Sequence, residues 1–152
     1  MKVLRYVAEV TVAAPVGRVM RAVTDIASIH EWNPALSALH ATDPVAVTGK
    51  PYGTRIRGLV PASVTYQTVT DTVATYEMSA LGNFERGIWQ VTEVAHGVSA
   101  VSHRFEHQGP ILRLMHDAFT PVAMWRLERL RALLVHQAKT LEVIPPASHS
   151  FE

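Results

Sequence analysis

The alternation of apolar and polar residues predicts a first strand followed by two short helices. Residues 3–14 alternate with a period of two, as in a strand with one buried face. Pro15 suits the first position of a helix, and valines recur at helical spacing up to Asp25. We expect this helix to be short, and a second short helix or turn to cover residues 26–31.

A run of strand-like segments follows. These segments are rich in valine, threonine and tyrosine, which pack well on a pleated sheet. Turn signals separate them about every ten residues, which indicates antiparallel hairpins joined in a meander. The predicted strands cover residues 36–42, 53–60, 63–70, 73–81, 85–94 and 98–107, with breaks at 49–53, 60–62, 70–71, 81–83 and 96–97.

From Ile111 the apolar period becomes helical. One stripe carries Ile111, Met115, Ala118, Val122, Leu127, Leu130, Leu134, Ala138 and Leu141. The charged residues that fall largely on the other side, interpreted as a solvated face, are Arg126, Glu128, Arg129, Arg131 and Lys139. Pro121 must kink this helix or restart it, with Thr120 as the candidate cap.

The length and the order of the elements favour one α+β domain. The chain has 152 residues, enough for a single domain with its own core. One antiparallel sheet and one long helix bury the inner sheet face most simply when the sheet curls around the helix. We therefore expect a single domain over residues 1–144 and a flexible tail over residues 145–152.

Composition narrows the classes of partner. Hydrophobic residues make up 48% of the chain and charged residues 18%, which suggests a large core or an apolar cavity. The formal charge of +1 gives no reason to expect nucleic acid. Cysteine is absent, which excludes disulfides and thiolate chemistry and fits a cytoplasmic protein. No stretch approaches the ~20 apolar residues of a membrane span, so membrane insertion is not expected.

Strand alternation indicates which side chains face the helix. Val101 and Phe105 set the inward face of the last strand, and His103 and His107 share it. The same reading brings these side chains inward from earlier strands: Val64, Tyr66, Tyr76, Met78, Glu85, Trp89 and Val91. Inward imidazoles must be hydrogen-bonded or lie in a wet cavity, so both histidines are candidates for chemistry, and a structural role is the alternative.

The connecting segment IHEWNPAL at residues 29–36 contributes further candidates. We predict that Trp32 covers the mouth of a cavity, with His30 and Asn33 at its rim. Simple packing of Trp32 onto the sheet is the alternative. Two residues from the helical region, Met115 and Phe119, complete the predicted ligand contacts.

Several segments resemble the polyketide cyclase/dehydrase and START-like proteins, also called the Bet v 1-like or helix-grip superfamily. The resemblance rests on APVGRV and VTDIASIHEWNP within residues 14–34, GIWQVTEVAHGVSAVSHRFEHQGP at 87–110 and RLERLRALL at 126–134. It implies a curved seven-stranded antiparallel sheet around a long C-terminal helix, with two short helices after the first strand and a deep cavity. Members bind lipids, sterols, polyketides or plant metabolites, and some catalyse cyclisation, aromatisation or dehydration.

The resemblance and the inward polar residues together predict binding of a hydrophobic, oxygenated small molecule, with acid–base chemistry of a cyclase or dehydratase. His103 is the first candidate base and His107 the second, Tyr66 or Tyr76 would hold an enolate oxygen, and Glu85 is a partner. A non-catalytic lipid or metabolite carrier is the alternative, and an interaction module is a third interpretation.

Three further expectations concern what the site lacks. The aromatase/cyclase branch of the superfamily usually carries an arginine inside the pocket, and the inward strand positions hold none. His103 and His107 would lie ~13 Å apart along a strand, too far to share one ion, so we expect no metal. No nucleotide-binding motif is present, so we expect no cofactor, and the chain is expected to be a monomer or homodimer.

Overall fold

The computed structural model describes residues 3–39 and 41–142. Its elements are β1 (Leu4–Val12), α1 (Val16–Thr24), the 3-10 helix η1 (Ile26–Ser28), α2 (Ile29–Trp32), β2 (Pro51–Ile56), β3 (Val60–Val69), β4 (Val73–Ala80), β5 (Asn83–Ala95), β6 (Val98–Gln108), α3 (Pro110–Leu114), α4 (His116–Phe119) and α5 (Val122–Glu142). The predicted tail at residues 145–152 lies outside the described residues.

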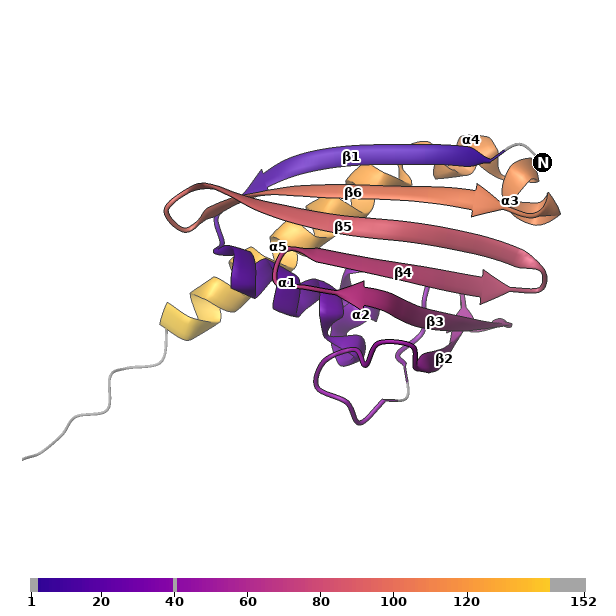
Figure 1. Cartoon of the computed structure of the whole chain (residues 1–152), viewed down its shortest axis with the longest axis horizontal. Helices are drawn as coiled ribbons and strands as arrows, with labels where there is room; N and C mark the ends of the chain where they lie inside the picture. Colours follow the sequence, from indigo (N-terminus) through magenta and orange to yellow (C-terminus); the bar gives the residue numbers. More distant parts are fainter. Residues whose placement is uncertain (1–2, 40, 143–152) are drawn as a thin grey trace, which may run out of the picture.

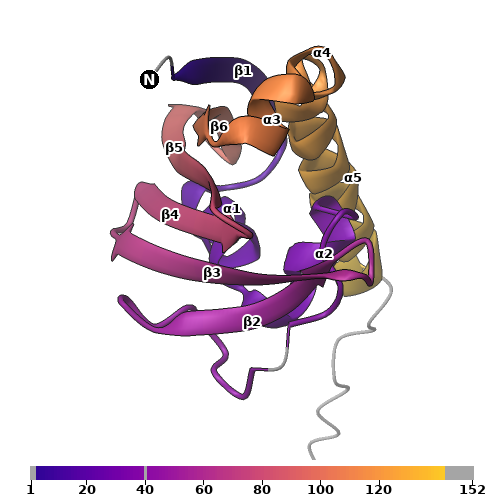
Figure 2. The same cartoon turned by 90° about the vertical axis from the view of Figure 1, so that its right-hand side faces the viewer.

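The strands form one antiparallel sheet in the order β1-β6-β5-β4-β3-β2, which curves around the long helix α5 (Figures 1 and 2). Helix α5 packs against β1 and β6 on the sheet and against the short helices α1 and α2. The predicted α+β helix-grip architecture is confirmed. The described residues contribute six strands to this sheet, whereas the resemblance implied seven.

The prediction of a strand at residues 36–42 is wrong. The described part of this segment forms only an isolated bridge, between Leu36 and Ile56. Leu36 and Leu39 are nonetheless buried, so the apolar residues that suggested a strand reach the core from an irregular segment. A short apolar run does not by itself distinguish these two structures.

The turn between β2 and β3 also differs from the prediction. Arg57 and Gly58 have φ angles of 50° and 71°, and the Leu59 amide donates to the Ile56 carbonyl at 3.0 Å. Positive φ at both central residues is typical of the turns that join antiparallel strands, and here Ile56 pairs with Val60 across a three-residue loop. The break therefore falls at residues 57–59 and not at 60–62.

The predicted helical stripe from Ile111 is divided into three helices. Helices α3 and α4 are short, and α5 begins directly after Pro121, as a restart of the helix there would require. Ile111 and Met115 are 48% and 40% exposed, so the first part of the stripe does not face the sheet. None of the described helices is long and apolar enough to cross a membrane.

Side chains fill the space between the sheet and α5. The large residues Tyr66, Trp89, Phe105, Leu127 and Leu130 are each at most 1% exposed. The best-formed hollows of the described surface lie beside α1 and along the outer face of α5, and neither borders the predicted lining residues. A ligand that reaches the predicted interior must therefore displace side chains that now pack together.

Candidate functional site

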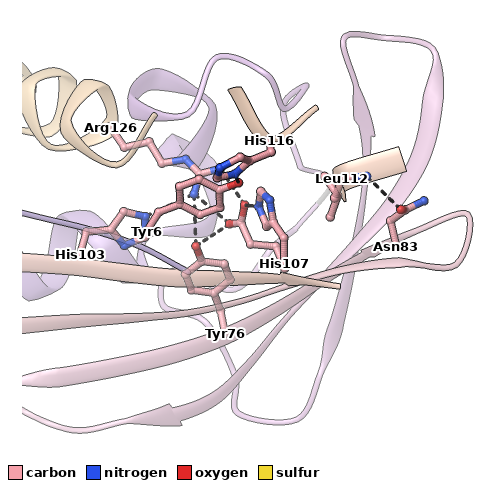
Figure 3. Close-up of polar contacts among 9 residues, drawn as sticks. Tyr6, Tyr76, Asn83, His103, His107, Leu112, His116 and Arg126 are labelled. Atoms are coloured by element: carbon pink, nitrogen blue, oxygen red, sulfur yellow. Dashed lines mark hydrogen bonds and ion pairs between the residues drawn. The ribbon is translucent and has the colours of Figure 1, made fainter. Parts of the chain in front are cut away.

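A buried cluster of polar side chains lies between the sheet and α5. Tyr76 comes from β4, Glu85 from β5, His103 and His107 from β6, and Arg126 from α5. Each of these residues is at most 5% exposed. Figure 3 shows the labelled side chains of Tyr76, His103, His107 and Arg126 directed toward one another. Such a concentration of polar groups in an apolar interior is costly unless each group is paired.

The strand register brings these side chains together. Glu85 and His107 are direct cross-strand partners on β5 and β6, so their side chains leave the sheet on the same face. Tyr76 lies opposite Gly87 in the β4–β5 ladder. A side chain at position 87 would collide with the Tyr76 ring, so glycine there allows the ring to lie across β5 and reach Glu85.

Glu85 is the centre of the cluster. Its Oε1 accepts from His107 Nε2 at 2.8 Å and from Arg126 Nη2 at 3.1 Å. Its Oε2 accepts from the Tyr76 hydroxyl at 2.6 Å and from Arg126 Nη1 at 2.8 Å. Four donors match the roughly four acceptor sites of an ionised carboxylate, so Glu85 is fully paired.

Glu85 and Arg126 both stay charged although they are buried, because each is paired with the other and with neighbouring polar groups. Burial would raise the pKa of Glu85, but the Arg126 guanidinium and the hydrogen bonds from His107 and Arg126 hold it well below its usual range. Burial would lower the pKa of Arg126, but Glu85 and Tyr76 raise it above its ordinary value. Burial and the neighbouring Glu85 raise the pKa of Tyr76, so its hydroxyl stays protonated.

The two inward histidines have different states. Arg126 Nη1 lies 3.2 Å from His103 Nε2, and a guanidinium can only donate, so this nitrogen accepts. The His103 ring also stacks on Trp89 with 3.8 Å between ring centroids. Burial and the nearby Arg126 charge lower the pKa of His103 to about 3. His103 is therefore neutral at physiological pH and its accepting nitrogen is already occupied, which argues against its predicted use as the base.

His107 keeps a free nitrogen. Glu85 is ionised and can only accept, so His107 Nε2 must donate to it. In the neutral ring the lone pair then lies on Nδ1, which is buried and has no hydrogen-bond partner among the described residues. The ring of Phe119 meets His107 edge-on, with 4.5 Å between centroids, and Tyr6 lies 5.1 Å away by the same measure. This carboxylate–imidazole pair is suited to accept a proton at Nδ1.

Three buried donors near the cluster lack hydrogen-bond partners among the described residues. Arg126 Nε and Trp89 Nε1 are buried, and neither donates to an acceptor within the part of the chain that the structure describes. Leaving such a group unpaired costs free energy, so each would gain from an acceptor oxygen on a ligand. His103 Nδ1, which carries the proton of that ring, is also buried without a partner there. The interior thus offers one unpaired acceptor, at His107, and three unpaired donors.

Residues 3–39 and 41–142 show no arrangement suited to a metal ion, since no three or more histidine, aspartate or glutamate side chains gather at one place. The carboxylate of Glu85, the main anionic ligand in the interior, is already saturated by Arg126, Tyr76 and His107.

The inward strand parity predicted from the sequence is confirmed for most residues. The predicted inward side chains that are buried are Val64, Tyr66, Tyr76, Glu85, Trp89, Val91, Val101, His103, Phe105 and His107, and Met78 is partly buried. Tyr66 is not part of the polar cluster, because its hydroxyl donates to the Val23 carbonyl of α1. That leaves Tyr76 as the tyrosine that contacts Glu85.

The predicted position of Trp32 at a cavity mouth is wrong. Trp32 is only 4% exposed, and its Nε1 donates to the Ala22 carbonyl at 3.3 Å. Its ring packs edge-on against Trp89, so it belongs to the core. Asn33 is also buried and His30 is partly buried. Met115 is exposed, and only Phe119 of the two helical candidates touches the cluster.

The prediction that Arg126 lies on the solvated helix face is also wrong. Arg126 is 5% exposed and supplies the arginine that the inward strand positions lack. The signal was present in the spacing: Arg126 lies three residues after Ala123 and four before Leu130, both of which are buried on the inner stripe. The positive charge of its side chain was the reason to predict that Arg126 is exposed to solvent.

Tyr6 and His116, which form a hydrogen bond beside His107, were not among the predicted site residues.

Comparison with known proteins agrees with this architecture. Residues 4–142 match the family described as polyketide cyclase/dehydrase and lipid transport. The chain belongs to this family. A comparison with curated proteins gives no match.

Solved structures of low sequence identity share the fold. A protein of the dynemicin biosynthetic locus, DynU16, is 19% identical with a TM-score of 0.67, over 86% of this chain and 47% of that one, so the chain spans about half its length. Norcoclaurine synthase from Thalictrum flavum, solved with dopamine and hydroxybenzaldehyde, is 12% identical with a TM-score of 0.65, over 89% and 88% of the two chains. A START superfamily protein from Mycobacterium smegmatis is 12% identical with a TM-score of 0.64, over 90% and 98%. These likenesses establish the fold and leave the chemistry to the residues of the site.

Proposed function

We propose that this family member binds a hydrophobic, oxygenated small molecule between the sheet and α5 and performs acid–base chemistry on it, as a cyclase or dehydratase would. One observation carries the proposal: His107 is held by the ionised Glu85 at 2.8 Å and keeps an unpaired, buried Nδ1. His103 Nδ1 is unpaired as well, but it carries the ring proton and cannot act as a base, so His107 Nδ1 is the unpaired acceptor.

In this proposal His107 Nδ1 removes a proton from a carbon next to a carbonyl group of the ligand. The ring becomes an imidazolium, and Glu85, in contact with Nε2, stabilises the positive charge. The departing electron pair moves onto the carbonyl oxygen as an enolate. Loss of a hydroxide from the neighbouring carbon, protonated as it leaves, would then complete a dehydration, and attack on a second carbonyl would complete a cyclisation.

The enolate oxygen needs donors that are fixed before the reaction. The Arg126 Nε–H and the Trp89 Nε1–H are buried and unpaired among the described residues, so they are the best candidates. Tyr76 donates its hydroxyl to Glu85, and so we assign it to holding Glu85 in place. Apolar walls such as Phe105 would exclude water.

The test uses 2-tetralone, an apolar ketone with acidic protons next to its carbonyl, in deuterium oxide. We expect the protein to accelerate exchange of these protons, followed by NMR, and His107→Gln to lose this acceleration by about 100-fold or more, because Nδ1 is removed. Glutamine can still donate to Glu85, so the carboxylate stays paired. His96→Gln, in the exposed β5–β6 turn, should leave the exchange rate unchanged.

Binding of 2-tetralone without accelerated exchange would contradict the catalytic part of the proposal. Quenching of tryptophan fluorescence measures binding separately, and a Trp125→Phe background removes the exposed third tryptophan so that the signal reports on the buried Trp32 and Trp89. Equal exchange in the wild type and His107→Gln would show that another group is the base. Tight binding of palmitate with no exchange of the ketone would favour the carrier.

A further inference from the structure

The segment that joins β6 to α5 covers His107. It consists of α3 and α4, which lie at the end of the molecule where β1 begins (Figures 1 and 2). No residue of either helix is fully buried, and Leu114 is 87% exposed. The partly buried Phe119 closes the site, because its ring edge packs on the His107 imidazole.

Two polar attachments hold this segment. At its start, Asn83 Oδ1 of β5 accepts from the amides of Ile111 and Leu112, at 3.0 and 3.3 Å. Further along, Tyr6 Oη of β1 and His116 Nδ1 of α4 form a hydrogen bond of 2.8 Å. Figure 3 shows both attachments. The Tyr6 side chain is only 6% exposed, whereas His116 is exposed.

We propose that α3 and α4 form a lid over His107 and that the hydrogen bond between Tyr6 and His116 is its latch. The inference rests on the proposed function, since it assigns the route by which a ligand reaches His107 Nδ1. When the latch opens, Phe119 moves off the imidazole, and the Tyr6 hydroxyl becomes free to contact an oxygen of the ligand. The same movement of the lid therefore opens the route to His107 and frees the Tyr6 hydroxyl to bind the ligand.

The two attachments determine which part of the lid can move away from His107. Gly109 precedes α3 with φ of 122°, and a side chain there would collide with Asn83, so this end of the segment is closely held. At the other end, α4 is joined through Thr120 and Pro121 to the start of α5, and one side-chain hydrogen bond and the Phe119 ring hold it over the site. Opening therefore lifts α4 between these two fixed ends, and it needs no change in the sheet.

Chemical modification of histidine measures this opening without any ligand. Diethyl pyrocarbonate acylates accessible neutral imidazoles, and peptide mass spectrometry reports the rate at each histidine. In the wild type, His107 should react far more slowly than the exposed His96. Tyr6→Phe and His116→Ala should each raise the rate at His107 roughly fivefold, the effect of losing one hydrogen bond. His116→Asn, whose amide oxygen can still accept from Tyr6, should restore a slow rate.

Two references separate lid opening from loss of stability. Leu114→Ala removes an exposed lid side chain without touching the latch, and it should leave the His107 rate unchanged. His103 lies on the same strand as His107 but is held by Arg126 under α5, so its rate should stay slow in the latch variants. Unchanged His107 rates in both latch variants, or equal increases at His103 and His107, would overturn the lid. Because no ligand is present, neither outcome depends on the exchange of 2-tetralone.

Discussion

Replacing Arg126 with methionine will lower the free energy of unfolding by about 4 kcal/mol, the largest loss we expect from any exchange of a charged residue in this chain. The reason is the ion pair with Glu85, in which both side chains are almost fully buried and two parallel hydrogen bonds join them. Without Arg126, the carboxylate remains inside the protein with donors only from Tyr76 and His107. Denaturant unfolding followed by circular dichroism gives the measurement.

A double variant distinguishes an unpaired charge from lost packing. Arg126→Met combined with Glu85→Gln should recover much of the stability, because exchanging both members of a buried ion pair costs far less than exchanging one. Arg129→Met, on the exposed face of the same helix, should change stability by no more than about 0.5 kcal/mol. A loss for Arg126→Met as small as that for Arg129→Met would show that the ion pair does not form in solution.

Mild acid will destabilise the wild-type protein more than His103→Gln. The folded protein resists protonation of His103, because burial and Arg126 lower its pKa to about 3, whereas the unfolded chain takes up this proton near its ordinary value of 6.5. A lowered folded-state pKa means that the stabilisation is complete above about pH 6.5 and is lost progressively as the pH falls toward 3. Glutamine keeps an oxygen that accepts from Arg126 and does not titrate.

The difference appears in the slope of stability against pH. Between about pH 6.5 and 4.5, the wild type should lose about 2 kcal/mol more than His103→Gln, since the slope approaches 1.4 kcal/mol per pH unit. The lowered pKa of Glu85 adds a loss only below about pH 4.3, where the unfolded carboxyl takes up its proton, and this loss is common to both proteins. Parallel stability curves over the upper range would contradict a neutral, buried His103.

Strand alternation predicted the interior well because β5 and β6 run through the site without a shift in register. The Glu85–His107 and Trp89–His103 pairs lie in an unbroken part of this ladder, and the one irregularity falls near Ala95, beyond the cluster. Period-two reading is reliable under this condition. It could place Glu85 and both imidazoles on the inner face, but it could not state which nitrogen of each ring would be occupied.

The helical part of the site could not be predicted in the same way. The sequence predicts an exposed Arg126 because buried arginine is rare, and its burial is compensated chiefly by Glu85, 41 positions earlier in the sequence. Tyr6 and His116 lie 110 positions apart, so their contact depends on how α4 closes against β1. The sequence predicts that Trp32 covers the mouth of a cavity, yet its ring packs on Trp89 in the core. The place of each of these side chains in the fold depends on a contact with a residue that is distant in the sequence.

The tautomers of the two inward histidines test the account most directly. A long-range correlation spectrum of protein labelled with nitrogen-15 in histidine, recorded at a pH at which both rings are neutral, distinguishes the two nitrogens of each ring. We predict a proton on Nε2 and a free lone pair on Nδ1 for His107, and a proton on Nδ1 with an accepting Nε2 for His103. A neutral His107 that carries its proton on Nδ1 would contradict the pairing with Glu85 and remove the proposed base.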